Sequence, residues 1–322
     1  MEPSRQSNGC AVALIGAGQM AREHARAFAD VPGVSLVGIQ SRTRARAERL
    51  ADEFGIARVC DTLGELYESS TACLVVVAVS ESAGGEVAEA CCRFPWVVFL
   101  EKPPGLTPAE ARRIRQCARE MSRTVIVGLN RRFYSGTQTV LEELKKEDGT
   151  RHIDVHDQQN QGVATDLGMP DRVVAHWMYV NSIHLIDYFR VFGRSPIASV
   201  TPVFPWTPDP VPPVVAAKIE FENGDTGLYE AVWRGPGPWA ASVTTAGRRW
   251  ELRPLEQLRV QRSGERTLEP IDPSPWDRAF KPGFRLQAEQ AVAAALGRHS
   301  RSVTLDDALE TMDLVSTIYG LA

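Results

Sequence analysis

Short apolar runs alternate with helical patterns over the first 130 residues. The apolar runs cover residues 11–15, 34–39, 73–79, 97–100 and 125–128, and the helical patterns cover 21–28, 44–54, 86–92 and 108–121. Continuous apolar strands that alternate with helices are typical of a parallel sheet covered on both faces. The pattern therefore predicts an α/β Rossmann domain over residues 1–129.

From about residue 130 the pattern changes to that of an α+β domain, residues 130–322. An alternating strand is predicted at 152–161, a hairpin at 214–221 and 226–233, and short strands at 241–245, 249–253 and 258–261. Helices are predicted at 180–192, 284–296 and 305–319, and the proline-rich stretch 202–213 is expected in a loop or at a sheet edge. We expect an open, largely antiparallel sheet with helices on one side, whose uncovered face forms a homo-dimer or homo-tetramer.

Composition and charge narrow the class of protein. Hydrophobic residues make up 43% and charged residues 24% of the chain, which is typical of a globular protein in water. The net charge is -4 and the basic residues are dispersed, which argues against nucleic acid as a partner. No 18-residue apolar run and no apolar signal core occurs, so we expect a cytoplasmic protein that does not span a membrane.

The six cysteines all fall in the first 120 residues and include no CxxC pair. No histidine lies at metal-ligand spacing from them. We interpret them as reduced thiols, and the sequence predicts no metal site.

A glycine motif follows the first strand. Gly16, Gly18 and Ala21 match G-x-G-x-x-G/A, with Gln19 and Met20 between them. The first glycine permits a tight turn, the second lets a pyrophosphate approach the backbone, and the third small residue lets helix and strand pack. Because the motif joins a predicted strand to a helix, it predicts dinucleotide binding.

The second strand ends without the carboxylate that usually binds the adenosine ribose of NAD. Basic and hydroxyl side chains follow instead: Ser41, Arg42, Arg44 and Arg46. Ser41 and Arg42 could bind a 2′-phosphate, which favours NADP over NAD. The alternative is that these arginines form only a solvated helix start.

Several further motifs occur in a fixed order. Glu101-Lys102-Pro103 ends a strand about 85 residues after the glycine motif. Four others follow: GLNRRF at 128–133, SIHLID at 182–187, FENG at 221–224 and DDALETM at 306–312. In this order they resemble the glucose–fructose oxidoreductase and inositol dehydrogenase family (Gfo/Idh/MocA) of NAD(P)-dependent oxidoreductases.

The resemblance implies roles for two residues. Lys102, after a cis Lys102–Pro103 bond, would hold the substrate oxygen near the nicotinamide with a lowered pKa, and Glu101 would lie near the cofactor. His184 would accept or donate a proton while a hydride moves to or from the nicotinamide. The alternatives are a solvated strand-end lysine and a histidine of the core.

The chain departs from the family pattern at Val180, where many members have Asp four residues before the histidine. Tyr179 and Asn181 are candidates to orient the substrate in its place. Asp187 either orients the His184 ring and binds substrate or makes a structural pair.

Other residues are assigned by their place in the chain. Asn130 and Arg131 follow the last Rossmann strand and are candidates to contact cofactor or substrate, whereas Arg132 could equally pair structurally. Ser80 and Glu81 are expected near the cofactor. His24, Trp177 and Trp233 are interpreted chiefly as packing residues.

These observations lead to one leading hypothesis. The chain is a dehydrogenase or ketoreductase that acts on a secondary alcohol or ketone of a sugar, a nucleotide-linked sugar or a cyclitol. The alternatives are an NAD-using glycosidase without net redox change and a non-catalytic dinucleotide-binding sensor.

Overall fold

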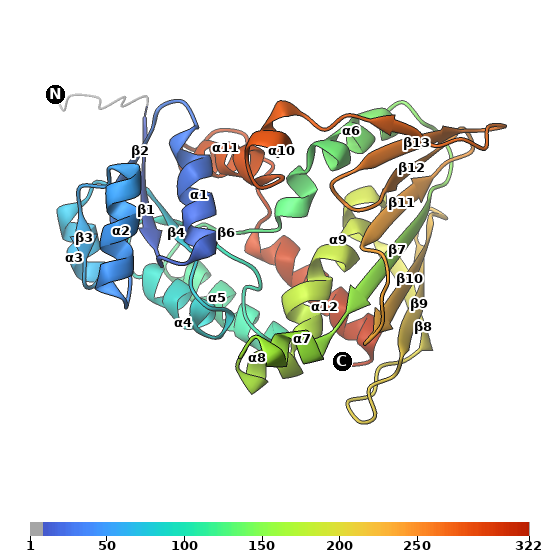
Figure 1. The fold of residues 1–322 in the computed structure, drawn as a ribbon, viewed down its shortest axis with the longest axis horizontal. Helices are drawn as coiled ribbons and strands as arrows, with labels where there is room; N and C mark the ends of the chain where they lie inside the picture. The colour runs from blue at the N-terminus through green and yellow to red at the C-terminus, as the bar shows by residue number, and fades with distance from the viewer. Residues whose placement is uncertain (1–8, 322) are drawn as a thin grey trace. The chain divides into compact units, whose positions relative to one another are not determined.

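The computed structural model describes residues 9–321, and the chain divides into two compact units (Figure 1). The first unit contains the residues through Gly105, Ala109–Asn130 and Ala279–Ala308. The second contains Leu106–Pro108, Arg131–Arg278 and the residues from Leu309 onward. The change of unit at Asn130 and Arg131 lies next to the predicted domain boundary.

The first unit is a doubly wound parallel sheet with the strand order β3-β2-β1-β4-β5-β6. Its strands are β1 (Cys10–Ile15), β2 (Val34–Gln40), β3 (Val59–Cys60), β4 (Leu74–Val77), β5 (Val97–Leu100) and β6 (Val125–Val127). Its first helices are α1 (Gln19–Ala29), α2 (Arg44–Phe54), α3 (Leu63–Ser69), α4 (Glu81–Cys91) and α5 (Pro108–Glu120). This order confirms the Rossmann prediction; β3 and α3 are too short to stand out in the sequence.

Helix α11 (Phe284–Ala295) also belongs to the first unit, although the sequence assigns it to the second domain. Its apolar face repeats at helical spacing, and Phe284, Ala288 and Ala291 join the core cluster that contains Phe28 of α1. Arg285 of α11 forms an ion pair with Asp30 at 2.6 Å. The chain therefore returns to the Rossmann core after residue 278, which periodicity alone does not indicate.

The second unit contains an eight-stranded sheet in the order β14-β13-β12-β11-β7-β10-β9-β8. The strands are β7 (His152–Gln159), β8 (Ile197–Phe204), β9 (Val214–Phe221), β10 (Thr226–Trp233), β11 (Ala240–Thr244), β12 (Arg248–Leu252), β13 (Leu258–Arg262) and β14 (Glu269–Ile271). Only β7 and β10 pair in parallel; the other described pairs are antiparallel. The predicted open, largely antiparallel sheet is confirmed.

Helices lie against one face of this sheet, and the figure shows none on its other face within the described residues (Figure 1). The helices of this part are α6 (Ser135–Leu144), α7 (Gln161–Asp166), α8 (Asp171–Ala175), α9 (Ile183–Phe192), α10 (Pro275–Ala279) and α12 (Leu305–Tyr319). A 3₁₀ turn (Asn130–Phe133) precedes α6, and a π-helical turn (Met178–Ser182) precedes α9. The homo-oligomer expected through the uncovered face stays a prediction.

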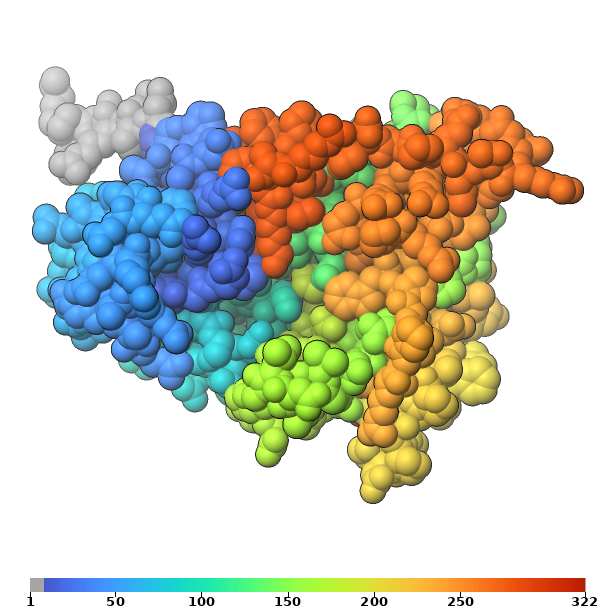
Figure 2. Space-filling model, in the orientation of Figure 1, coloured from blue at the N-terminus to red at the C-terminus, as the bar shows by residue number. Residues whose placement is uncertain are grey.

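The proline-rich stretch lies at the edge of the sheet, as predicted. Pro202 is within the edge strand β8, and the following loop projects from that edge (yellow in Figures 1 and 2). An edge position suits proline because it has no backbone N–H to donate to a neighbouring strand.

All six cysteines are free thiols. Cys10 and Cys73 lie on neighbouring segments with their sulfur atoms 3.4 Å apart. Within residues 9–321, no helix is both long enough and apolar enough to cross a membrane.

Candidate functional site

A pocket of about 480 Å³ lies in the first unit where the strand order reverses between β1 and β4. Ligands of open α/β sheets bind at this point, beyond the carboxyl ends of the strands. Seven residues predicted to bind cofactor line the pocket together: Gly16, Gly18, Gln19, Met20, Ser41, Arg42 and Ser80. Its volume is within the roughly 300–1,000 Å³ usual for small-molecule and cofactor sites.

Glycine is required at the two positions of the motif for different reasons. Gly16 has φ +109°, and a Cβ there would lie 2.1 Å from the backbone oxygen of Ala78. A Cβ at Gly18 would meet no atom within 4 Å. Gly18 precedes α1, whose first turn contains no acidic side chain. The open space at a helix N-terminus fits the pyrophosphate of a dinucleotide.

A matched pair of variants separates these two reasons. Gly16→Ala is expected to lower the free energy of unfolding by about 2 kcal/mol or more, because of its positive φ and the clash with Ala78. Gly18→Ala is expected to leave the free energy of unfolding within about 0.5 kcal/mol but to weaken dinucleotide binding about tenfold or more. Chemical denaturation and calorimetric titration measure the two effects. Unchanged NADPH and NADH binding by Gly18→Ala would contradict the assignment.

The three arginines after β2 differ in their partners. Arg44 donates to Glu48 at 3.0 Å and to both carboxylate oxygens of Asp61 at 2.9 Å. Arg42 and Arg46 instead line the pocket. Arg44 thus makes the surface ion pairs that the alternative of a solvated helix start describes. Phosphate binding by Arg42 stays a prediction.

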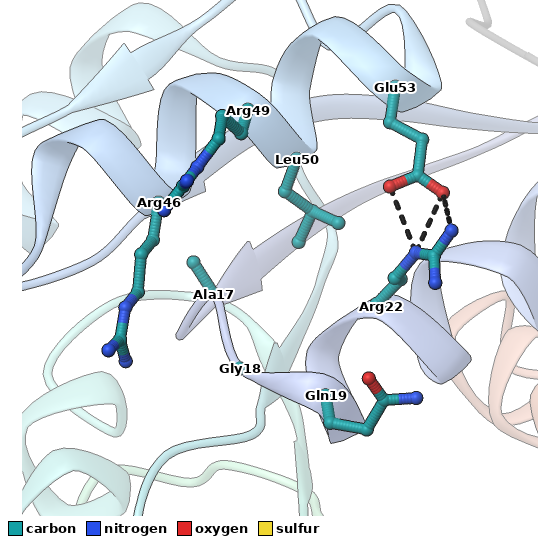
Figure 3. A pocket seen from close by; sticks show the side chains of 8 residues that line it. All are labelled: Ala17, Gly18, Gln19, Arg22, Arg46, Arg49, Leu50 and Glu53. Atoms are coloured by element: carbon teal, nitrogen blue, oxygen red, sulfur yellow. Dashed lines mark hydrogen bonds and ion pairs between the residues drawn. The ribbon is translucent and has the colours of Figure 1, made fainter.

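Arg46 also borders a second, adjoining pocket of about 320 Å³, shown in Figure 3. Arg22 on its wall is paired with Glu53 at 2.7 Å, as the dashed lines indicate. Arg46 is not among the residues that the sequence predicts to bind the cofactor. The available sequence signal for it is its place at the start of α2, shortly after Ser41 and Arg42.

Lys102 follows β5 and is held at its backbone by the preceding carboxylate. Glu101 Oε2 accepts from the Lys102 backbone N–H at 3.2 Å, while Oε1 lies 2.5 Å from Nε2 of His24. The His24 ring is 1% exposed and stacks on Phe284 with ring centroids 4.6 Å apart. The Lys102–Pro103 bond is cis, as the resemblance implies.

His24 therefore does more than pack, because it fixes a buried carboxylate. Burial alone would raise the pKa of Glu101, but the hydrogen bond and charge of His24, together with Lys102 and Lys281, hold that pKa below its usual range. Glu101 and Lys102 do not line the described cofactor pocket. Their roles toward the cofactor stay predictions.

His184 is 5% exposed and lies in the first turn of α9. Asp187, on the same helix, accepts from Arg132 Nε and Nη2, both at 2.6 Å, and from the Thr311 hydroxyl at 2.8 Å. This bidentate ion pair is the structural pairing that the sequence left open for Arg132 and Asp187. Asp187 as a substrate ligand stays a prediction that its contacts do not favour.

The residues before His184 are anchored within the second unit. Val180 is buried in a small apolar cluster with Leu106 and Val173, so no carboxylate occupies that position. The Tyr179 hydroxyl lies 2.8 Å from the Ser316 hydroxyl.

Asn181 takes part in a different contact, since its Nδ2 donates to Oε1 of Gln159 at 2.9 Å. Sequence reasoning missed Gln159, which is fully buried on β7 and carries no motif signal. Trp233 is 2% exposed and packs against Trp206 in a tilted arrangement, with ring centroids 4.3 Å apart. Trp177 packs on the apolar cluster around Val180, so both contacts agree with packing roles.

The two candidates after β6 each have a partner within their own unit. Asn130 Nδ2 donates to the backbone oxygen of Pro282 at 3.1 Å. The Arg131 guanidinium lies over the Trp239 ring, 4.5 Å from its centroid, in a cation–π contact. Their contacts with cofactor or substrate stay predictions.

A sequence model of the family GFO_IDH_MocA, described as an oxidoreductase family with an NAD-binding Rossmann fold, matches residues 10–129. The Rossmann domain of this chain therefore matches the Gfo/Idh/MocA family. The family that the motifs resemble is thereby confirmed, and the matched range covers the pocket at the ends of β1, β2 and β4.

Two relatives illustrate the similarity of this chain to known enzymes. It is 29% identical to D-glucoside 3-dehydrogenase of Escherichia coli over 45% of this chain and 41% of that protein. It is 23% identical to inositol 2-dehydrogenase of Salmonella paratyphi B over 60% of this chain and 57% of that protein. The alignments thus span about half the length of these relatives.

The fold extends beyond the matched domain. A dehydrogenase structure from Chromobacterium violaceum superimposes with a TM-score of 0.82 at 20% identity, over 97% of this chain and 94% of that one. The second unit therefore also has a fold known in dehydrogenase structures.

Proposed function

We propose that the chain is an NAD(P)-dependent dehydrogenase or ketoreductase that acts on a secondary alcohol or ketone of a sugar or cyclitol. The observation that carries the proposal is the pocket at the strand-order reversal, where the glycine motif, Ser41 and Arg42 lie together. The open space at Gly18 supports a bound pyrophosphate, and the family match supports a nicotinamide cofactor.

The basic side chains around the second strand end favour NADP. Arg42 and Arg46 line the pocket with Ser41 and Thr43, and Gln40 ends β2 where NAD-binding domains usually carry a carboxylate. Gln40 donates to the backbone oxygen of Asp61 and adds no negative charge at the pocket. Guanidinium and hydroxyl donors together suit a 2′-phosphate.

Lys102 and His184 are the proposed catalytic residues. When bound, the nicotinamide supplies or accepts the hydride. Lys102, whose backbone is fixed by Glu101, would hold the substrate oxygen and exchange a proton with it. His184, at the start of α9, would accept the hydroxyl proton in oxidation or return it in reduction.

The substrate class rests on the two relatives. Both are named as dehydrogenases, one of a glucoside and one of an inositol. We propose a cyclic polyol or its ketone, including a nucleotide-linked sugar, as the substrate.

The test is hydride transfer measured by nicotinamide absorbance, with NADPH and a keto-inositol, and with NADP⁺ and myo-inositol or methyl glucoside. We expect the cofactor and the polyol to change in equimolar amounts. Release of the aglycone from an aryl glucoside without net cofactor change would instead indicate a glycosidase. Tight dinucleotide binding without turnover of any of these substrates would indicate a sensor.

A further inference from the structure

A buried carboxylate lies beneath the helix that carries His184. Asp157 of β7 is 1% exposed and on the face of the sheet where its neighbours Ile153 and Val155 contribute to the core. Asp157 Oδ2 accepts from the Tyr229 hydroxyl at 2.9 Å, and Oδ1 accepts from Gln159 Nε2 at 2.6 Å. An ionisable group at such a position requires an explanation, since an apolar residue would suit the core better.

The described hydrogen bonds at Asp157 are all donated to its carboxylate oxygens. Burial raises the pKa of Asp157, and donors from Ser182, Tyr229, Gln159 and the backbone of Gln158 oppose that rise. The Gln159 amide nitrogen can only donate, so the Asp157 oxygen that faces it accepts. The surrounding groups therefore define Asp157 as an acceptor.

The hydrogen bond to Asp157 fixes the orientation of two side-chain amides in turn, first that of Gln159 and then that of Asn181. Because Gln159 Nε2 donates to Asp157, Gln159 Oε1 points the other way, and it accepts from Asn181 Nδ2 at 2.9 Å. The direction of the first bond thus fixes the direction of the second. Asn181 is left with its Oδ1 on the opposite edge of its amide.

Asn181 is the partly exposed end of the chain, whereas Asp157 and Gln159 are buried. It is three residues before His184, in the π-helical turn that leads into α9. The position at which many family members carry a carboxylate is occupied here by Val180, whose side chain is packed in an apolar cluster.

We propose that Asp157, through Gln159, fixes the Asn181 amide so that its Oδ1 accepts a hydrogen bond from a substrate hydroxyl beside the one that reacts. Asp157 and Gln159 are positioning residues, and Asn181 is the residue that selects a polyol substrate. The inference rests on the proposed function, and it specifies a neutral acceptor at the position next to the one where a carboxylate is usual.

If Asp157 positions Asn181, the single and double variants of these two residues should show a pattern of activities that a purely structural role does not predict. In Asp157→Asn the new Nδ2 can donate to Gln159 Oε1, which reverses both amides and turns Asn181 Nδ2 toward the substrate. In Asn181→Asp the new carboxylate faces Gln159 Oε1, and two acceptors oppose each other. In the double variant the reversed Gln159 donates to the carboxylate introduced at position 181, so an acceptor again faces the substrate.

The experiment measures kcat/KM for a keto-inositol with NADPH in the wild type, both single variants and the double variant. We expect each single change to lower kcat/KM about 10- to 100-fold, because a buried polar group is mispaired. The double variant is expected within about threefold of the wild type. As a control, Ser316→Ala removes the contact of Ser316 with Tyr179 outside the amide chain, and is expected within about twofold.

Neutron diffraction of deuterated crystals tests the amide directions independently of turnover. We expect the Gln159 deuterons to face the carboxylate of Asp157 in the wild type and to face Asn181 in Asp157→Asn. The opposite direction in the wild type, or additive losses in the double variant of an active enzyme, would overturn the inference. A wild type that binds NADPH but does not reduce the keto-inositol would contradict the proposed function instead, and the assigned role of Asn181 would fall with it.

Discussion

Replacing Lys102 with Ala is expected to lower kcat about 10³-fold, within the range of roughly 10²–10⁴ typical for loss of a positioned acid–base group. NADPH affinity is expected to stay within about threefold, because the described pocket is lined by other residues. The half-buried side chain extends from a loop whose backbone Glu101 holds, so the fold should persist. Single-turnover kinetics with a keto-inositol separates the chemical step from binding.

Two further variants distinguish charge from proton transfer at this position. Lys102→Arg retains a positive charge but cannot release a proton at ordinary pH, so its kcat is also expected to be low. If Lys102 and His184 act on one substrate, the double alanine variant should lose little more than the worse single variant. A Lys102→Ala enzyme within threefold of wild-type kcat would exclude the proposed role.

Removing Arg42 and Arg46 together is expected to weaken NADPH binding about 30-fold or more, because charge-assisted hydrogen bonds contribute about 1.5–3 kcal/mol each. NADH lacks the 2′-phosphate, so its affinity should change less than about threefold. Calorimetric titration of both dinucleotides measures the difference.

Arg44→Ala is the matched control for this prediction. It removes one positive charge from the same segment, but Arg44 is paired with Glu48 and Asp61 instead of lining the pocket. We expect it to leave the preference between NADPH and NADH unchanged. An equal loss in Arg44→Ala would mean that general charge, and not a phosphate site, governs binding.

Much of the first unit and of its pocket could be predicted from the sequence. Two local signals indicate the pocket. One is the glycines that end the first apolar strand, and the other is the polar residues that follow β2 and β4. The carboxyl ends of neighbouring parallel strands meet at one edge, so these residues converge whatever the details of packing. Gly16, Ser41 and Ser80 were placed in this way, and the structure brings them into one pocket.

Residues whose role depends on a distant partner could not be assigned. That Arg44 is held in surface ion pairs depends on whether Asp61 lies within reach, and that depends on how α2 packs beside β3. The structural role of Asp187 depends on Arg132, which lies 55 residues earlier and donates to both of its carboxylate oxygens. The role of His24 depends on Glu101, which is 77 residues away.

The sequence by itself determined most strands of the first unit, the glycine turn and the resemblance to the family, because periodicity and turn chemistry are local properties of the chain. Tertiary structure alone decided that α11 packs in the Rossmann core and that a buried Asp157 directs the amides of Gln159 and Asn181. An apolar helix face can pack on any apolar surface, and a polar residue in a strand looks solvent-facing until its register is known. The direction of a hydrogen bond is fixed only when donor and acceptor are packed together.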